Sequence, residues 1–349
     1  MSAQSYRPIY SEASLRAKQI DEETRYWARR SLEHREHFTS QRCGRFEFLS
    51  RPHAVRESSG GHGSPGSQPK PSIVPETLLR QIAESEAVDK EPRDQAKRDL
   101  EYAKRGEGPA ADPVFNEVYI NVGLVLKFYQ DQFGRDSIDN RNMRVISSVH
   151  FGVQYQNAYW DPVRQQIVFG DSSKFLYYFT HSLDIIGHEL TYAVTEYTSP
   201  LVYQGQSRAL NKHISDVFGI MFKQNVENET VASADWLIGE GCLLPGVVGI
   251  ALYSIKAPGT AYNDARFGRD PQPASIAEYN PTTKDYGGVH IYSGIPNRAF
   301  YLASIGLAAA GFSDYSWKHM GQIWWKTMRS GRVPPKCTFV QFADIYRGG

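Results

Sequence analysis

The sequence predicts an α+β protein in two lobes with a cleft between them. Segments with the alternating apolar pattern of β-strands lie before residue 182, helical periodicity dominates after it, and no internal repeat interrupts this order. An order in which strands come first and helices later, without regular βαβ alternation, is typical of α+β folds. The chain has 349 residues, which is enough for one large or two medium domains with a sizeable core.

Four parts are expected along the chain: a helical N-terminal extension at 1–51, a flexible linker at 52–72, an N-terminal lobe at 73–205 and a helical C-terminal lobe at 206–349. The extension is highly charged with few apolar positions, so we expect exposed helices that dock onto the rest of the chain. The linker is rich in Gly, Ser and Pro, a composition typical of flexible segments.

Apolar spacing predicts the elements of the two lobes. Pro75 stands at the start of a helical pattern that runs to about Arg105. The segment 114–133 has apolar residues at three-and-four spacing and is predicted to be a helix. Two alternating segments predict strands, at 143–152 and 165–171. The later helices are predicted at 183–197, 208–226, 295–310 and 316–329.

Charge and cysteine content exclude several function classes. Lys plus Arg number 39 and Asp plus Glu 38, so no overall field indicates binding to nucleic acid or to a membrane. Cys43, Cys242 and Cys337 are odd in number and far apart, which fits neither a zinc knuckle nor a disulfide framework and favours a reducing compartment. Without an apolar signal core or a run of membrane-spanning length, the protein is expected to be cytoplasmic.

The stretch DIIGHELTYAVTEYT, residues 184–198, begins like a zinc-peptidase motif. In an H-E-x-x-H helix the two histidines share one face and bind zinc, and the intervening Glu is the general base. Here His188 and Glu189 are followed by Tyr192 where the second histidine would stand. A bare His-Glu pair is a weak signal, but further blocks follow in order: ALNKHISDVFG, DWLIGEG, SIKAPGTAY and GGVHIYSGIPNRAFYLA.

Together these blocks give residues 73–345 a resemblance to the thermolysin-like neutral metallopeptidases, and within them to the protealysin-type branch. The resemblance implies a thermolysin-like two-lobed fold, α+β in class. Its N-terminal lobe is mixed, its C-terminal lobe is mainly helical, and a central helix carries the metal motif along the floor of the cleft.

The resemblance also implies roles for individual residues. His188 matches the first zinc ligand and Glu189 the general base, whereas the other two ligand positions are occupied by Tyr192 and Lys212. His213 lies next to Lys212, but one helical step turns it by about 100° onto another face. Asn211 and Asp216 match the residues that orient the metal histidines. Tyr203 and His290, the latter with Asp285, match the residues that stabilise the transition state. Asn157 and Ala158 match the residues that clamp the substrate backbone.

Tyrosines stand at several positions where the family has charged or amide side chains. Tyr253 replaces the arginine that grips the substrate, and Tyr286 and Tyr292 lie on either side of His290. Flat rings of this kind suit an apolar or aromatic small molecule.

No bound cofactor is expected from this residue set. A catalytic zinc ion takes three protein ligands, and only His188 remains, so zinc is predicted to be absent and no residue is assigned as a metal ligand. The family's calcium site is predicted to be weakened, because Lys223 and Leu237 stand where acidic residues are usual.

The leading hypothesis is a metal-free, non-proteolytic enzyme that reuses the cleft for cyclisation, isomerisation or condensation of a small biosynthetic intermediate. Glu189 and His290 with Asp285 would transfer protons, Lys212 and Tyr203 would donate hydrogen bonds, and the tyrosines with His188 and Asn211 would bind the substrate. Two alternatives stay open: an inactive pseudopeptidase that binds a peptide or partner, and a residual zinc metallopeptidase.

Overall fold

The computed structural model describes residues 113–151, 155, 157–170, 179–202, 204–265 and 268–348. The predicted N-terminal extension, the linker and the helix expected up to Arg105 all lie outside these residues. The docking expected of the extension is therefore untested.

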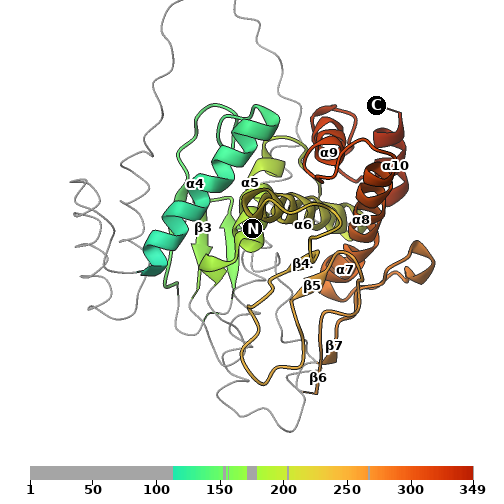
Figure 1. Cartoon of the computed structure of the whole chain (residues 1–349), viewed down its shortest axis with the longest axis horizontal. Coiled ribbons are helices and arrows are strands. Elements are labelled where there is room, and N and C mark those ends of the chain that lie inside the picture. Colours follow the sequence, from blue (N-terminus) through green and yellow to red (C-terminus); the bar gives the residue numbers. More distant parts are fainter. Residues whose placement is uncertain are drawn as a thin grey trace, which may run out of the picture.

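Two buried helices form the centre of the described structure. In Figure 1, α5 (Leu183–Glu196) and α6 (Gly205–Glu227) lie side by side in the middle of the molecule. On one side of them are α4 (Pro113–Phe133) and a three-stranded sheet. On the other side are four helices of the C-terminal half: α7 (Asp285–Tyr292), α8 (Gly294–Ala309), α9 (His319–Arg329) and α10 (Phe339–Arg347). The described residues therefore form an α+β fold, as predicted.

A small mixed sheet covers one side of α5. Its strands are β1 (Ile146–Ser148), β2 (Ala158–Asp161) and β3 (Gln166–Phe169), in the order β1-β3-β2. The middle strand β3 runs parallel to β1 and antiparallel to β2, with Ala158 opposite Phe169. Strand β2 lies at one edge of this sheet, and its neighbour within the sheet is β3. The predicted strands at 143–152 and 165–171 are confirmed but shorter, and β2 was not predicted.

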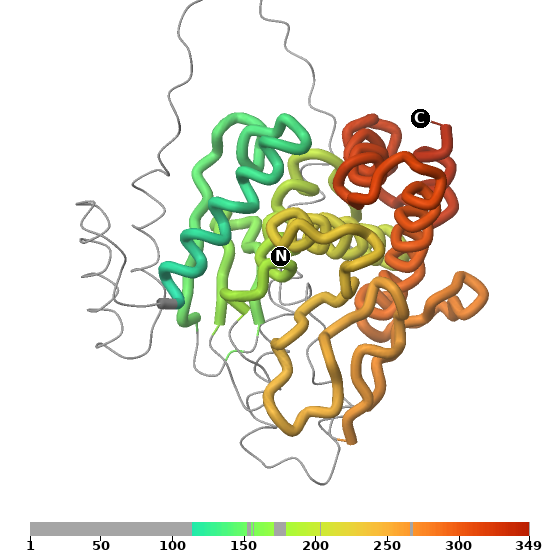
Figure 2. Tube along the Cα trace, in the orientation of Figure 1, coloured from blue at the N-terminus to red at the C-terminus, as the bar shows by residue number. Residues whose placement is uncertain are grey.

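The long segment between α6 and α7 is mostly irregular. It runs along the lower part of Figure 2, and its described residues form short pairs of strands and a short 3-10 helix. These are β4 (Leu237–Ile238) with β5 (Tyr253–Ser254), β6 (Asn263–Asp264) with β7 (Gly268–Arg269), and Ile276–Glu278. A second 3-10 turn, Phe179–His181, precedes α5.

The helices predicted within the described residues occur, some with shifted ends. Helix α6 begins at Gly205, three residues before the predicted start, and α9 begins at His319, three residues after it. Helices α7 and α10 were not predicted. The first turn of α7 has left-handed backbone at Asp285 through Gly288, so helical periodicity could not reveal it. Helix α10 has nine residues and is recognisable mainly by its capping box, in which Thr338 and Gln341 satisfy each other's backbone N–H groups.

Two glycines allow α5 and α6 to approach closely. A Cβ atom added to Gly219 would lie 2.5 Å from the backbone oxygen of Asp184 and 3.0 Å from the backbone nitrogen of His188. A Cβ on Gly187 would lie 3.0 Å from the Cα of Gly219. Glycine is thus required at this crossing, because any larger side chain would push the two helices apart. The candidate-site residues lie next to this crossing, after Gly187 on α5 and before Gly219 on α6.

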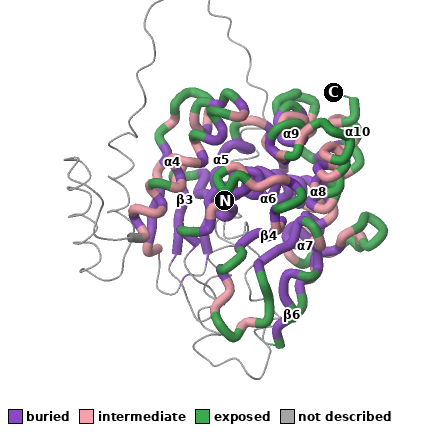
Figure 3. The backbone as a smooth tube through the Cα atoms, viewed as in Figure 1, coloured by how far each residue is buried: buried purple, intermediate pink, exposed green. Residues whose placement is uncertain are grey.

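Burial is concentrated around these two helices, as Figure 3 shows. Helix α5 is buried along nearly its whole length, polar residues included. Helix α4 packs against it, and the Tyr129 hydroxyl of α4 lies 2.7 Å from Thr191 Oγ1. Val118, Val122 and Val125 of α4 are buried in the same core. Within the described residues, no helix is long and apolar enough to cross a membrane.

Candidate active site

Helix α5 carries His188, Glu189 and Tyr192 in the middle of the molecule. Their side chains are fully buried, with 1%, 0% and 0% of their surface exposed. The rings of His188 and Tyr192 lie edge to face with centroids 5.0 Å apart, as expected for residues four apart on one helix face. The sequence-predicted motif therefore assembles on one face, with a phenol in place of the second imidazole.

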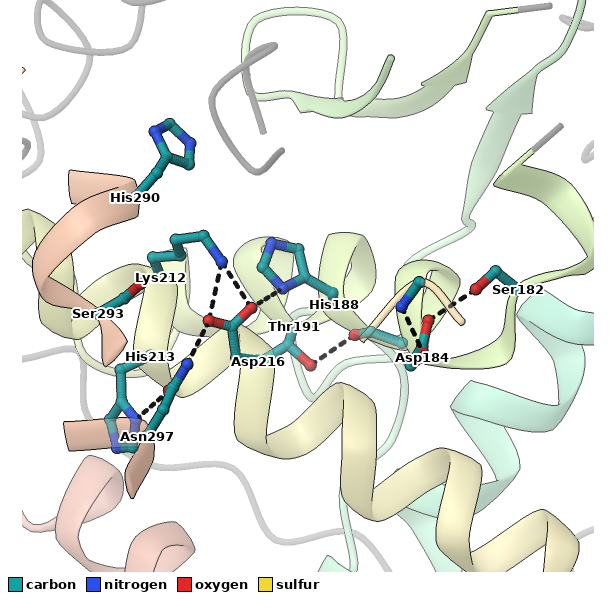
Figure 4. Close-up of polar contacts among 12 residues, drawn as sticks. Ser182, Asp184, His188, Thr191, Lys212, His213, Asp216, His290, Ser293 and Asn297 are labelled. Atoms are coloured by element: carbon teal, nitrogen blue, oxygen red, sulfur yellow. Dashed lines mark hydrogen bonds and ion pairs between the residues drawn. The ribbon is translucent and has the colours of Figure 1, made fainter. Parts of the chain in front are cut away.

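Lys212 and Asp216 form a buried ion pair on α6. The ammonium Nζ of Lys212 lies 2.8 Å from each carboxylate oxygen of Asp216, and both side chains are 0% exposed. Asp216 Oδ1 also lies 2.9 Å from His188 Nδ1, which joins α6 to α5. Figure 4 shows Asp216 between these two partners. The predicted orienting role of Asp216 thus fits its place, but the same carboxylate is shared with Lys212.

These contacts determine the charges of the group. Burial alone would raise the pKa of Asp216, but the Lys212 ammonium and the hydrogen bonds from His188 and Asn297 hold it well below its ordinary value. Burial lowers the pKa of His188 to about 4, although Asp216 opposes this. At neutral pH the site therefore contains an ionised Asp216 beside a neutral His188.

The ammonium of Lys212 also lies over an aromatic ring. Its Nζ is 4.1 Å from the ring centroid of Tyr253, which is 1% exposed and belongs to β5. This is a close cation–π contact, and burial strengthens such contacts. Tyr253 therefore stabilises the lysine, in addition to any contact with a substrate.

His290 and Asp285 form a second polar pair, on α7. His290 Nδ1 lies 2.6 Å from Asp285 Oδ1, and the His290 backbone N–H donates to Asp285 Oδ2 at 2.7 Å. The left-handed first turn of α7 brings the two residues together, because it lets the chain fold back within five positions. Gln272 Nε2 donates to the backbone oxygen of His290 at 2.8 Å. Since α7 packs against α6, this pair belongs to the same region as Lys212.

The other predicted site residues have varied surroundings. Asn157 and Ala158 stand at the start of the edge strand β2, where Asn157 Oδ1 accepts the N–H of Ala158 at 3.0 Å. The Tyr286 ring lies 4.1 Å from Arg208 Cζ. The Tyr292 hydroxyl donates to the backbone oxygen of Asn280. Asn211 is buried on α6, and Tyr203 lies outside the described residues.

Three residues that were not predicted as site residues, Asn297, His213 and Trp324, are linked to Asp216 by hydrogen bonds. Asn297 on α8 donates from Nδ2 to Asp216 Oδ2 at 2.8 Å. His213 Nδ1 lies 2.8 Å from Asn297 Oδ1, and its Nε2 accepts the indole N–H of Trp324 at 2.8 Å. The sequence signal for this arrangement was the helical rotation between neighbouring residues, which places the His213 side chain on a different face of α6 from Lys212.

The residues at the family's three ligand positions do not fit a zinc ion. His188 offers an imidazole, Tyr192 a buried phenol, and Lys212 an ammonium that Asp216 already holds. An ammonium has no lone pair to offer a metal. Within the described residues there is also no group of three or more His, Cys, Asp or Glu side chains that could hold a metal ion.

A lysine also stands among the carboxylates of the predicted calcium site. Lys223 Nζ lies 2.8 Å from Asp235 Oδ2 and 3.4 Å from Glu240 Oε2. Burial would lower the pKa of Lys223, but Asp184 and Asp235 raise it above its ordinary value. The weakening of calcium binding remains a prediction.

Comparison with known proteins identifies the family of the two halves. Residues 93–196 match the thermolysin metallopeptidase catalytic domain, and residues 199–346 match the thermolysin metallopeptidase alpha-helical domain. An extracellular metalloprotease of Pectobacterium carotovorum subsp. carotovorum is 44% identical over 239 residues, which are 68% of this chain and 67% of that protein. Protease PrtS of Photorhabdus sp. (strain Az29) is 37% identical, over 78% of this chain and 71% of that protein.

A solved structure shows the same likeness. The precursor of protealysin, a metalloproteinase from Serratia proteamaculans, superposes with a TM-score of 0.66 at 38% identity. The match covers 78% of this chain and 91% of that chain. The fold inferred from the sequence blocks is confirmed by this match.

These comparisons correct the functional expectations. Relatives named as metalloproteases contradict the expected non-proteolytic, zinc-independent cyclase or isomerase and the expected freedom from any cofactor, and they do not indicate inactivation. The expectation was wrong because it rested on two expected ligand replacements. Such replacements concern which groups could bind a metal ion, and they do not determine which reaction the site catalyses. Some relatives are named extracellular, so the cytoplasmic location remains a prediction.

Proposed function

Because the chain belongs to the thermolysin family of metallopeptidases, we propose that it acts on peptides and hydrolyses peptide bonds at the site formed by α5, α6 and α7. The observation that carries this proposal is the match of both halves of the family, in order, to residues 93–196 and 199–346. A peptide thus takes the place of the small biosynthetic molecule as the proposed occupant.

The residues of the site support two parts of peptide hydrolysis. One part is removal of a proton from the attacking water, and the other is stabilisation of the charge that develops on the carbonyl oxygen. Glu189, buried beside His188 on α5, is the candidate for the first. After it has taken the proton from water, the same carboxyl group would pass it to the leaving amine.

His290 is the candidate for the second part. An ionised carboxylate can only accept hydrogen bonds, so Asp285 implies that His290 Nδ1 carries a proton. The ring is thereby oriented, and in its doubly protonated form it could donate from Nε2 to a developing oxyanion. The Lys212 ammonium adds a second positive charge in this region. Tyr203 is assigned to the same role by resemblance alone.

Peptide cleavage by the purified full chain tests the proposal. The assay uses internally quenched fluorescent peptides and casein, with added Zn²⁺ and separately with a chelator, and Glu189→Gln as the matched control. Gln retains shape and hydrogen bonding but cannot act as a base, so the variant should lose about 10²- to 10⁴-fold in rate with an unchanged melting temperature.

The control also removes the effect of contaminating proteases, because both proteins are purified alike. Wild-type turnover no faster than that of Glu189→Gln in every metal condition would overturn the proposal. Peptide binding without turnover would then identify the site as a binding site only.

A further inference from the structure

A chain of buried hydrogen bonds runs from α9 through α6 and α8 to the carboxylate of Asp216. Its members are Trp324, His213, Asn297 and Asp216, and none of them is more than 2% exposed. Each of the three links is 2.8 Å long. Figure 4 shows the part from His213 to Asp216 and its continuation to His188 and Lys212.

The first link determines the direction of all the others. An indole N–H can only donate, so His213 Nε2 must be an acceptor and carries no proton. A neutral imidazole with a bare Nε2 has its proton on Nδ1, which therefore donates to Asn297 Oδ1. The amide of Asn297 is then oriented with its Nδ2 towards Asp216 Oδ2, where it donates.

We propose that His213 is a positioning residue, which with Trp324 and Asn297 holds the Asp216 carboxylate in the orientation that binds His188 and Lys212. The inference deepens the proposed function, on which its catalytic consequence rests. Every donor in the chain meets one acceptor, and a fully satisfied buried network holds a single arrangement. The His213 ring also packs edge to face on Trp324 and Phe342, which limits its rotation.

The position of Asp216 requires such support. The carboxylate faces a histidine on α5 and a lysine on its own helix at the same time. A small rotation of the carboxylate would exchange or break these contacts, whereas a third donor on Oδ2 opposes that rotation. Groups that orient active-site residues in this way typically change activity by about 10- to 100-fold when they are removed.

The first experiment measures the ring nitrogens of the full chain by NMR with ¹⁵N-labelled histidine. In the wild type we expect His213 to be neutral with its proton on Nδ1. Trp324→Phe retains the ring and removes only the N–H, so it should shift the ring signals of both His213 and His188. The matched control is Trp236→Phe, which removes a buried indole bond to a backbone carbonyl, that of Val231, outside this chain. It should leave both histidines unchanged.

The second experiment compares two substitutions of His213 in the peptide assay. His213→Asn can still donate to Asn297 from a position like that of Nδ1, whereas His213→Leu cannot. We expect His213→Leu to lower kcat about 10- to 100-fold with little change in KM, and His213→Asn to recover most of that loss.

Two results would overturn the inference: a proton on Nε2 of His213 in the wild type, or a Trp324→Phe protein whose His188 signals match those of the wild type. Neither of these two NMR measurements needs turnover, so both remain decisive if the chain proves not to cleave peptides. If Trp324→Phe does not fold, the wild-type state of His213 and the Asn/Leu comparison still decide.

Discussion

At the scale of single residues, one lysine changes the character of the site. The resemblance predicts a metal ligand at the position of Lys212, whose ammonium is held by Asp216 and by the Tyr253 ring. A buried ion pair contributes little net stability over an apolar pair, but removal of one partner leaves an uncompensated charge in the interior. The chain contains a matched exposed pair, Lys127 with Asp131, at the same i,i+4 spacing on α4.

Lys212→Met should therefore lower the free energy of unfolding by about 3 to 5 kcal/mol, because the Asp216 carboxylate loses its counter-charge. Lys127→Met, at a pair that is 67% and 47% exposed, should cost less than about 1 kcal/mol. Urea denaturation of the wild type and both variants measures the difference. Equal losses in the two variants would show that Asp216 does not depend on Lys212.

At the scale of elements, the crossing of α5 and α6 holds the site together. Gly187 and Gly219 let the helix backbones meet, and His188 lies one residue beyond this contact. The link between His188 and Asp216 is 2.9 Å long and joins these same two helices, so a separation of a few tenths of an ångström would weaken it.

Gly219→Ala should separate the two helices and destabilise the protein by about 1 to 3 kcal/mol, the usual cost of overpacking a core. Gly306→Ala is the control, since a Cβ at that exposed position of α8 meets nothing within 4 Å. There the better helix propensity of Ala should stabilise by up to about 1 kcal/mol. Thermal unfolding compares the two, and a neutral Gly219→Ala would refute the close-approach argument.

At the scale of the whole molecule, two fully buried histidines make stability depend on pH. Burial lowers the pKa values of His188 and His213 to about 4, whereas an unfolded histidine titrates near 6.5. Below pH 6.5 the unfolded chain thus binds more protons, and stability falls as the pH falls towards 4. Asp216 and Lys212 are the charged groups that face His213, and the low pKa of Asp216 affects stability only under more acidic conditions. Burial raises the pKa of Asp184, which opposes the trend.

The free energy of unfolding should therefore decrease from pH 7 to pH 5, by roughly 2 kcal/mol for each of the two histidines. His213→Asn should reduce the slope of stability against pH over this range by about 1 kcal/mol per pH unit. Urea titrations at several pH values measure both slopes. A parallel pH dependence in the variant and the wild type would mean that His213 has the same pKa in the folded protein as in the unfolded chain.

The sequence alone determined the family, the fold class and most helices, because these depend on local periodicity and on blocks of adjacent residues. From the resemblance it also predicted that Tyr192 and Lys212 stand at metal-ligand positions, and helix geometry places Tyr192 on the same face as His188. It did not determine the reaction, and the expected non-proteolytic chemistry was contradicted by the relatives.

Tertiary structure alone decided which polar groups meet. Trp324 and His213 are 111 residues apart, and Asn297 and Asp216 are 81 apart, so no spacing in the sequence indicated either contact. The sharing of Asp216 between Lys212 and His188 likewise required α5 and α6 to cross at their glycines. The spacing of apolar residues in the sequence predicts which face of a helix is buried. The partner that a buried polar group finds depends on how the helices pack in three dimensions.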